Sequence, residues 1–132
     1  MVETYRGDEL GRVIWSGSAQ ADTARPTPVL GVDEGRVLRA PRAGTFLGGC
    51  RIGALVPVNW RVGEVEGVPI TSRVAGLVRG LLHDGVAVEG GTKIGDIDPR
   101  GAEVDPARLS DKGRAVAAGV LEAVLTHFKG RF

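Results

Sequence analysis

From residue 36 to residue 98, short apolar runs alternate with glycine-containing turns, and this pattern is written twice. A shift of 32 residues superimposes the two copies. The identities include Ala43-Gly44 with Ala75-Gly76, Gly48 with Gly80, Gly53 with Gly85, Val56 with Val88 and Gly63 with Gly95. Two copies are too few for a solenoid, which needs at least three units to bury its faces. We therefore expect the copies to close on each other as one small β domain with a near-twofold axis.

Each copy predicts four short strands separated by turns. In the first copy they cover residues 36–39, 45–47, 56–58 and 61–65. In the second copy they cover residues 70–74, 77–79 continuing into 81–83, 86–88 and 93–97. The copies join at Glu66-Gly67-Val68-Pro69. We expect the equivalent segments near Leu38 and Ile70 to superpose and to lie in one sheet.

The sequences on either side of residues 36–98 predict appendages to this core. Residues 1–35 read as an irregular N-terminal arm with one strand at 12–15 and a Pro/Gly linker from 25, expected to lie on the β core. Residues 99–132 read as a connector and a helix that begins after the N-cap Ser110. The apolar stripe of this helix is also expected to pack on the β core, so that deletion of residues 110–132 leaves an aggregating core. Its members are Val116, Ala117, Val120, Leu121, Val124, Leu125 and Phe128.

Composition narrows the class of protein. The chain has 132 residues, of which 42% are hydrophobic and 25% charged, typical of a soluble globular domain. A net charge of +1 and scattered basic residues argue against a nucleic-acid partner. No apolar run reaches the length of about 20 residues that a membrane helix needs, and no signal peptide is evident. With one cysteine, Cys50, the chain suits a reducing compartment, and we expect a cytoplasmic location.

The polar cluster of greatest chemical interest is Asp96, Asp98 and Arg100, because alternate residues of a strand share one face. Two carboxylates on one face could bind a hard cation such as Mg²⁺, or with Arg100 could grip a polar ligand. In the alternative interpretation these residues bind no ligand: Asp98 caps the turn before Pro99, and Arg100 forms an ion pair with it that stabilises the fold. The second interpretation is favoured, because such roles are common. Glu64 and Glu66 occupy the equivalent places in the first copy.

The remaining reactive side chains indicate no catalytic or metal site, and no cofactor is predicted. Cys50 aligns with Leu82, which favours a packed thiol over a nucleophile. His83 aligns with Arg51 and is expected to point outward, and His127 falls in the last turn of the helix. The two histidines have no metal-ligand spacing.

The second copy resembles a biotinyl/lipoyl carrier domain from Ile70 to Ile97, in its Ala-Gly turn, Asp84-Gly85 turn, Gly90-Gly91 turn and closing Ile94-Gly95-Asp96-Ile97. That resemblance implies a mainly β barrel-sandwich hybrid made of two interlocked half-barrels. In that family one lysine on the hairpin between the halves is modified. Here the joint at 66–69 has no lysine, since the chain's lysines are Lys93, Lys112 and Lys129. The resemblance therefore extends to the fold and not to the carrier function.

A second resemblance covers nearly the whole chain. The motifs Glu3-Thr4-Tyr5-Arg6-Gly7, Arg36-Val37-Leu38-Arg39-Ala40-Pro41, Lys93-Ile94-Gly95-Asp96-Ile97-Asp98-Pro99-Arg100 and Ser110-Asp111-Lys112 stand in order. They are similar to those of the selenium-dependent molybdenum hydroxylase system protein family. The resemblance implies an accessory role in the maturation of molybdenum hydroxylases such as xanthine dehydrogenase.

Members of that family also have an α/β half before this region, and no Gly-x-Gly-x-x-Gly after a strand marks one here. We therefore expect a C-terminal or stand-alone half whose partners are proteins: the molybdenum enzyme, its maturation machinery or the missing domain. A half that evolved beside another domain should expose an apolar patch where that domain packed. Such patches tend to self-associate, so we also expect a homo-oligomer.

Overall fold

The computed structural model describes residues 1–21 and 28–129, which fall into two compact units. Residues 25–106 form one, here called the β unit, and residues 1–24 with 107–132 form the other, here called the helical unit. This division differs from an expected core with two appendages, because the N-terminal and C-terminal segments belong to the same unit.

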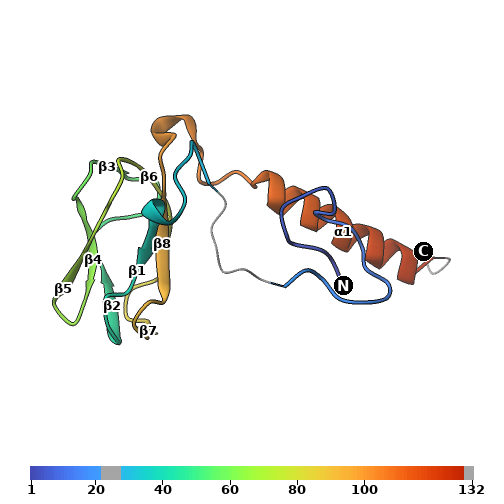
Figure 1. The fold of residues 1–132 in the computed structure, drawn as a ribbon, viewed down its shortest axis with the longest axis horizontal. Helices are drawn as coiled ribbons and strands as arrows, with labels where there is room; N and C mark the ends of the chain where they lie inside the picture. Colours follow the sequence, from blue (N-terminus) through green and yellow to red (C-terminus); the bar gives the residue numbers. More distant parts are fainter. Residues whose placement is uncertain (22–27, 130–132) are drawn as a thin grey trace. The chain divides into compact units, whose positions relative to one another are not determined.

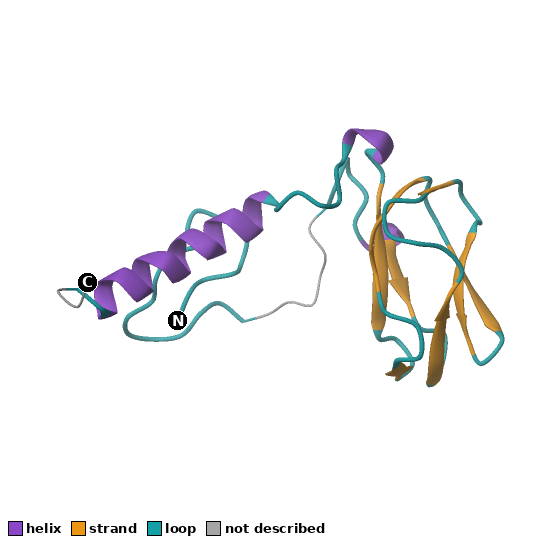
Figure 2. Ribbon diagram, turned by 180° about the vertical axis from the view of Figure 1, so that it is seen from behind, coloured by secondary structure: helices purple, strands orange, loops and turns teal. Residues whose placement is uncertain are grey.

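The β unit is built from two four-stranded antiparallel sheets, which Figure 2 shows as two layers. One sheet has the strand order β1-β8-β6-β3, and the other has the order β5-β4-β2-β7 (Figure 1). The strands are β1 Val37–Arg39, β2 Gly44–Gly48, β3 Leu55–Val56, β4 Arg61–Val65, β5 Val68–Thr71, β6 Gly76–Leu81, β7 Ala87–Val88 and β8 Lys93–Asp98. Two short 3₁₀ helices flank them, η1 Glu34–Arg36 and η2 Gly101–Glu103.

The repeat in the sequence is a repeat in the fold. A shift of 32 residues carries β1 to β4 onto β5 to β8 within one residue at each end. The same shift converts the order of one sheet into the order of the other. Each sheet therefore combines strands from both copies, and the prediction of a mainly β structure is confirmed.

The expectation that the segments near Leu38 and Ile70 lie in one sheet, on which the predicted architecture depends, is wrong. Leu38 pairs with Gly95 in one sheet, whereas Ile70 pairs with Gly63 in the other. An axis that exchanges the two sheets must place equivalent segments in opposite sheets, so separation of Leu38 from Ile70 follows from the symmetry.

The core of the β unit obeys the same relation. It consists of five equivalent pairs and one alanine: Leu38 and Ile70, Phe46 and Val78, Val56 and Val88, Val62 and Ile94, Val65 and Ile97, and Ala40. The residue equivalent to Ala40 is Ser72, which is fully buried. Its hydroxyl donates to the Pro57 carbonyl at 2.6 Å and accepts from the Trp60 amide at 2.9 Å, so burial leaves its hydrogen bonds satisfied.

The two copies meet at the hairpin between β4 and β5. Val65 pairs with Val68 across it, and Glu66 and Gly67 form the turn with φ values of 48° and 77°. Positive φ at both central residues is the signature of a type I′ turn, whose twist matches that of the adjoining strands. The joint predicted at 66–69 is thus a tight two-residue turn.

In the helical unit, α1 Asp111–His127 begins where the sequence predicted. The Ser110 hydroxyl accepts a hydrogen bond from the Gly113 amide at 3.0 Å and so caps the helix. The strand predicted at 12–15 is wrong: this segment has one isolated bridge, Val2 to Val13. The pairing stays short because the neighbouring residues 5–11 and 15–17 form turns and bends.

Within the helical unit, α1 packs against the N-terminal segment. A side chain at Gly119 would come within 2.0 Å of the Gly11 carbonyl, and one at Gly11 within 2.4 Å of the Ala115 carbonyl. Arg6 adds a two-pronged ion pair to Asp111, at 2.5 and 2.9 Å. Because Asp111 is 72% exposed, solvent screens this pair and its contribution to stability is small.

Most of the apolar stripe of α1 lies on the side of the helix away from Gly119, at 100° per residue. Val120, Leu121, Val124, Leu125 and Phe128 are between 37% and 58% exposed. None of the helices in the described residues combines the length and the apolarity needed to cross a bilayer.

Candidate functional site

Of the three residues predicted to cluster at the end of β8, Asp98 and Arg100 are in contact, and Asp98 is buried, with 1% of its surface exposed. The carboxylate of Asp98 accepts hydrogen bonds from the Arg100 amide at 3.1 Å, Arg100 Nε at 2.9 Å and Arg100 Nη2 at 2.7 Å. It also accepts one from Arg79 Nη1 at 3.1 Å. Both oxygens are therefore occupied by neighbouring donors, in the two-pronged geometry that arginine favours.

Asp96, on the same face of β8, has separate partners. Its Oδ2 accepts from Arg36 Nη1 at 2.8 Å, and its Oδ1 lies 3.4 Å from Lys93 Nζ. In the first copy Glu64 pairs with Arg61 in the place equivalent to Asp96 and Lys93. Glu66, equivalent to Asp98, accepts from the Thr45 amide at 2.8 Å instead of from an arginine.

The symmetry of the repeat breaks beside Asp98. In the first copy Phe46, Leu47 and Gly48 pair in register with Val65, Glu64 and Gly63. In the second copy the register of β6 against β8 shifts between Val78 and Gly80. The residue at this irregularity is Arg79, and such bulges re-aim side chains. Here the bulge accompanies the contact from Arg79 to Asp98.

These contacts favour the structural interpretation of Asp96, Asp98 and Arg100. The hydrogen bonds from Arg100, with a smaller contribution from Arg79, lower the pKa of Asp98 from 3.8 to about 2 against the opposing effect of burial. A carboxylate held ionised by four donors stabilises the turn that follows β8. Among residues 1–21 and 28–129, no three His, Cys, Asp or Glu side chains are grouped closely enough to hold a metal ion.

The other candidate residues lie where the repeat places them. Cys50 and its equivalent Leu82 are both partly buried against the core. The Cys50 Sγ lies 3.7 Å from the Val62 carbonyl oxygen, and burial raises the pKa of the thiol. His83 is exposed and contacts the Asp84 carbonyl at 2.8 Å. His127 is exposed in the last turn of α1 and meets Phe128 edge-on at 4.8 Å.

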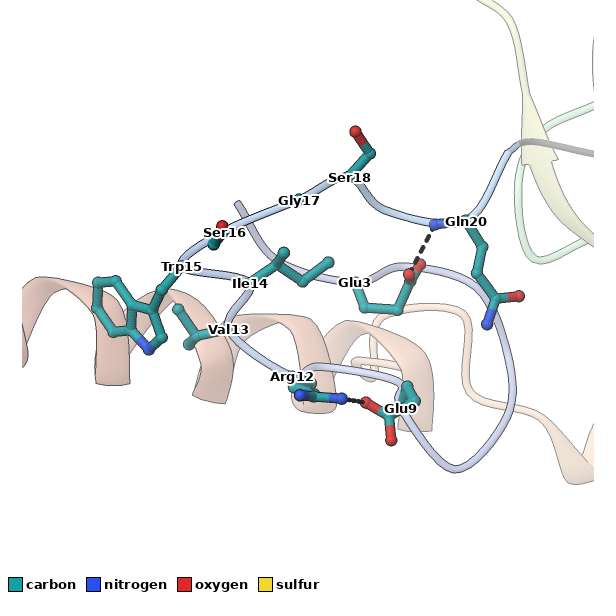
Figure 3. Close-up of a pocket in the computed structure, with 10 residues that line it drawn as sticks. All are labelled: Glu3, Glu9, Arg12, Val13, Ile14, Trp15, Ser16, Gly17, Ser18 and Gln20. Atoms are coloured by element: carbon teal, nitrogen blue, oxygen red, sulfur yellow. Dashed lines mark hydrogen bonds and ion pairs between the residues drawn. The ribbon is translucent and has the colours of Figure 1, made fainter.

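The helical unit contains a hollow of about 450 Å³ that the sequence did not reveal (Figure 3). Its walls are Glu3, Glu9, Arg12, Val13, Ile14, Trp15, Ser16, Gly17, Ser18 and Gln20. Glu3 is 4% exposed, and its carboxylate accepts from the amides of Thr4 at 2.8 Å, Tyr5 at 2.7 Å and Gln20 at 2.8 Å. These bonds, led by that from Gln20, lower its pKa. Through these hydrogen bonds, Glu3 holds the backbone at Gln20 against the N-terminal residues.

No local sequence signal could have assigned that role to Glu3. Its partner amide at Gln20 lies 17 residues away, and a backbone donor leaves no mark in the sequence. The ion pair of Arg12 with Glu9 forms another wall of the hollow and is a surface pair between neighbours in sequence.

Comparison with known proteins gives one informative relative. No protein-family model matches the chain. The chain is 48% identical over 129 residues to the uncharacterized protein YqeB of Escherichia coli K12. That alignment covers 95% of this chain and 23% of the relative, so the chain spans about a quarter of the relative's length. The name of this relative assigns no activity.

One solved structure also aligns with part of the chain. It is an aspartoacylase family protein from Mesorhizobium loti, matched over 48% of this chain and 23% of that one, at 18% identity and a TM-score of 0.42. A likeness at this level carries no argument about function.

Proposed function

We propose that this chain is a non-catalytic scaffold half of an accessory protein for molybdenum hydroxylases of the xanthine dehydrogenase type, in the cytoplasm. Support comes from the ordered motifs of the selenium-dependent molybdenum hydroxylase system family described above.

We also propose that the β unit is a barrel-sandwich hybrid. The supporting observation is the exchange of β1 to β4 for β5 to β8 between the two sheets. Two interlocked halves of that kind are what the biotinyl/lipoyl resemblance implies.

The observation that carries the scaffold role is the β4–β5 hairpin. A carrier domain of this fold presents its modified lysine at this turn, whereas here Glu66 and Gly67 fill it. The described lysines lie elsewhere: Lys93 at the start of β8, Lys112 in the first turn of α1 and Lys129 after the helix. A domain that has the fold of a carrier but no lysine at the β4–β5 turn cannot carry the modified group. Its surface remains available for contact with another protein.

Deletion of the gene in the organism that encodes the chain tests the proposal. Xanthine dehydrogenase activity should fall while the amount of enzyme polypeptide is unchanged, and the intact gene should restore it. Activity that is unaffected by the deletion would overturn the accessory role. Mass spectrometry of the natively expressed chain should show the unmodified mass, and a lysine adduct would favour a carrier.

The ligand-binding alternative at Asp96, Asp98 and Arg100 has its own test. Titration with Mg²⁺, followed by calorimetry, should give no difference between the wild-type chain and Asp96→Asn/Asp98→Asn. Binding by the wild type that the double variant loses would revive that alternative.

A further inference from the structure

The two copies of the repeat serve as internal controls for each other. They share fold, core positions and turn positions, so the fold alone does not account for a surface property that one copy has and the other lacks. The largest such difference concerns residues 51–61, which run from the end of β2 through β3 to the start of β4, and their equivalents, residues 83–93.

In the first copy this segment exposes four large apolar side chains. Ile52 is 50% exposed, Leu55 61%, Val58 52% and Trp60 51%. The equivalent residues of the second copy are Asp84, Ala87, Gly90 and Thr92. At every one of these positions the sister copy has a small or polar residue, so this backbone does not require an apolar one.

The charges of the two segments differ in the same direction. Residues 51–61 contain Arg51 and Arg61, at the two ends, and no acidic residue, a formal charge of +2. Residues 83–93 contain Asp84, Glu89 and Lys93, a formal charge of −1 with histidine neutral. Residues 51–61 thus have apolar residues, Ile52 and Pro57, at the positions where residues 83–93 have the acidic residues Asp84 and Glu89.

The segment is held rigidly by main-chain contacts. The Gly53 amide donates to the Val78 carbonyl at 2.8 Å, and Leu55 and Val56 pair with β6. Asn59 and Trp60 are tied to Ser72 through the Asn59 amide at 2.8 Å and the Trp60 amide at 2.9 Å. These bonds place exposed Arg73 beside the Trp60 end, whereas the Leu55 end adjoins Gly101 of η2. Large side chains on a fixed frame lose little entropy when a partner covers them.

We propose that residues 51–61 are the docking surface of this chain for the molybdenum hydroxylase, whose contacting face is apolar with carboxylates at its rim. This inference rests on the proposed function for the identity of the partner. Trp60 is the proposed anchor, because it is the largest exposed apolar side chain of the segment and tryptophan is among the residues that contribute most to binding. Arg61 is paired with Glu64, so the exposed cations at the two ends of the segment are Arg51 and Arg73. A twofold contact with a second copy would bring these cations of identical segments together, which costs affinity, and so favours a different protein.

The repeat also supplies the variants for the test. Trp60→Thr, Val58→Gly and Leu55→Ala each install the residue that the sister copy has at the equivalent place. The same fold accommodates these residues there, so the thermal midpoint should change little. Val86→Ala in the second copy is the matched control, since Val86 is 37% exposed and is equivalent to Ala54.

The experiment measures binding of the full chain to purified xanthine dehydrogenase, isolated before and after cofactor loading and immobilised on a biosensor. We expect the wild type and Val86→Ala to bind alike, and Trp60→Thr to raise the Kd by about tenfold or more. Raised salt should weaken binding of the wild type more than that of Arg51→Ala.

Each other outcome contradicts the inference in a distinguishable way. If the wild type fails to bind either form of the enzyme, the proposed function and this inference fall together. If the wild type binds and the three variants bind equally well, the docking surface is wrong while the function stands. If light scattering shows a dimer that Trp60→Thr dissociates, the segment joins copies of this chain.

Discussion

At the scale of single residues, the repeat explains why certain side chains stand where they do. Asn59 and Gly91 are equivalent, and both adopt left-handed backbone, with φ of 64° and 82°. Their amides donate to the equivalent carbonyls of Ser72 and Ala40, each at 2.8 Å. Glycine and asparagine are the residues that tolerate this conformation best.

This equivalence predicts that the two residues can be exchanged. Asn59→Gly and Gly91→Asn should each change the free energy of unfolding by less than about 0.5 kcal/mol, whereas Asn59→Ala and Gly91→Ala should each cost about 1 kcal/mol. Urea unfolding followed by circular dichroism measures all four. A large loss in either exchange variant would show that the two turns are not equivalent.

Asp98 gives a prediction about pH. Because its pKa in the folded chain is about 2, against an ordinary value of 3.8, it stabilises the fold above pH 4 and that stability disappears as pH falls toward 2. The difference corresponds to about 2 kcal/mol. Asp98→Asn should therefore lower the thermal midpoint near neutral pH and remove much of its decline between pH 4 and 2.

Asp8→Asn, at an exposed position of the helical unit, is the control and should leave the pH profile unchanged. A profile that is the same in Asp98→Asn and in the wild type would contradict the structural role given to the ion pairs of Asp98.

At the scale of elements, glycine turns and the Ser110 cap act locally, so several strands and the start of the helix were predicted well. The strand expected at 70–74 is instead β5 Val68–Thr71, the one expected at 56–58 is β3 Leu55–Val56, and β6 ends at Leu81 where the prediction continued to residue 83. The strands at 61–65 and 93–98 differ from the prediction by one residue at most. The predictions from sequence were wrong where a structure depends on residues that are distant in the sequence. The lone bridge from Val2 to Val13 and the glycine contact between Gly11 and α1 depend on residues that are distant in sequence.

The candidate site shows the same division. The alternative interpretation, in which Asp98 pairs with Arg100 at the turn before Pro99, agrees with the hydrogen bonds that Arg100 donates to Asp98. The bulge at Arg79 was not predictable, since the aligned residue in the first copy, Leu47, lies in regular register.

The contact between α1 and the N-terminal segment predicts the effect of one methyl group. In Gly119→Ala, the added carbon would meet the Gly11 carbonyl at 2.0 Å, so the two segments must separate although alanine favours a helix by about 1 kcal/mol. We expect a lower thermal midpoint and faster hydrogen exchange in residues 1–21.

Gly113→Ala is the matched control, because its added carbon would lie 3.3 Å from the Ser110 hydroxyl and is accommodated by a small shift. Equal stability of the two alanine variants would contradict the close approach of Gly11 to α1.

At the scale of the whole molecule, the division into two units changes the expected effect of truncation. The β unit has its own core, and α1 belongs to the helical unit. Deletion of residues 110–132 should therefore leave the β unit folded and release residues 1–21, which nuclear magnetic resonance would show as narrow, poorly dispersed signals from that segment alone. An aggregated product would restore the original expectation that the helix covers the β core.

The central claim concerns the β unit: it is one motif used twice, with strands exchanged between two sheets. Solution nuclear magnetic resonance tests it most directly through interstrand contacts between backbone protons. The account predicts contacts from Leu38 to Gly95 and from Ile70 to Gly63, one in each sheet. Contacts that instead join Leu38 to strands of its own copy would contradict it.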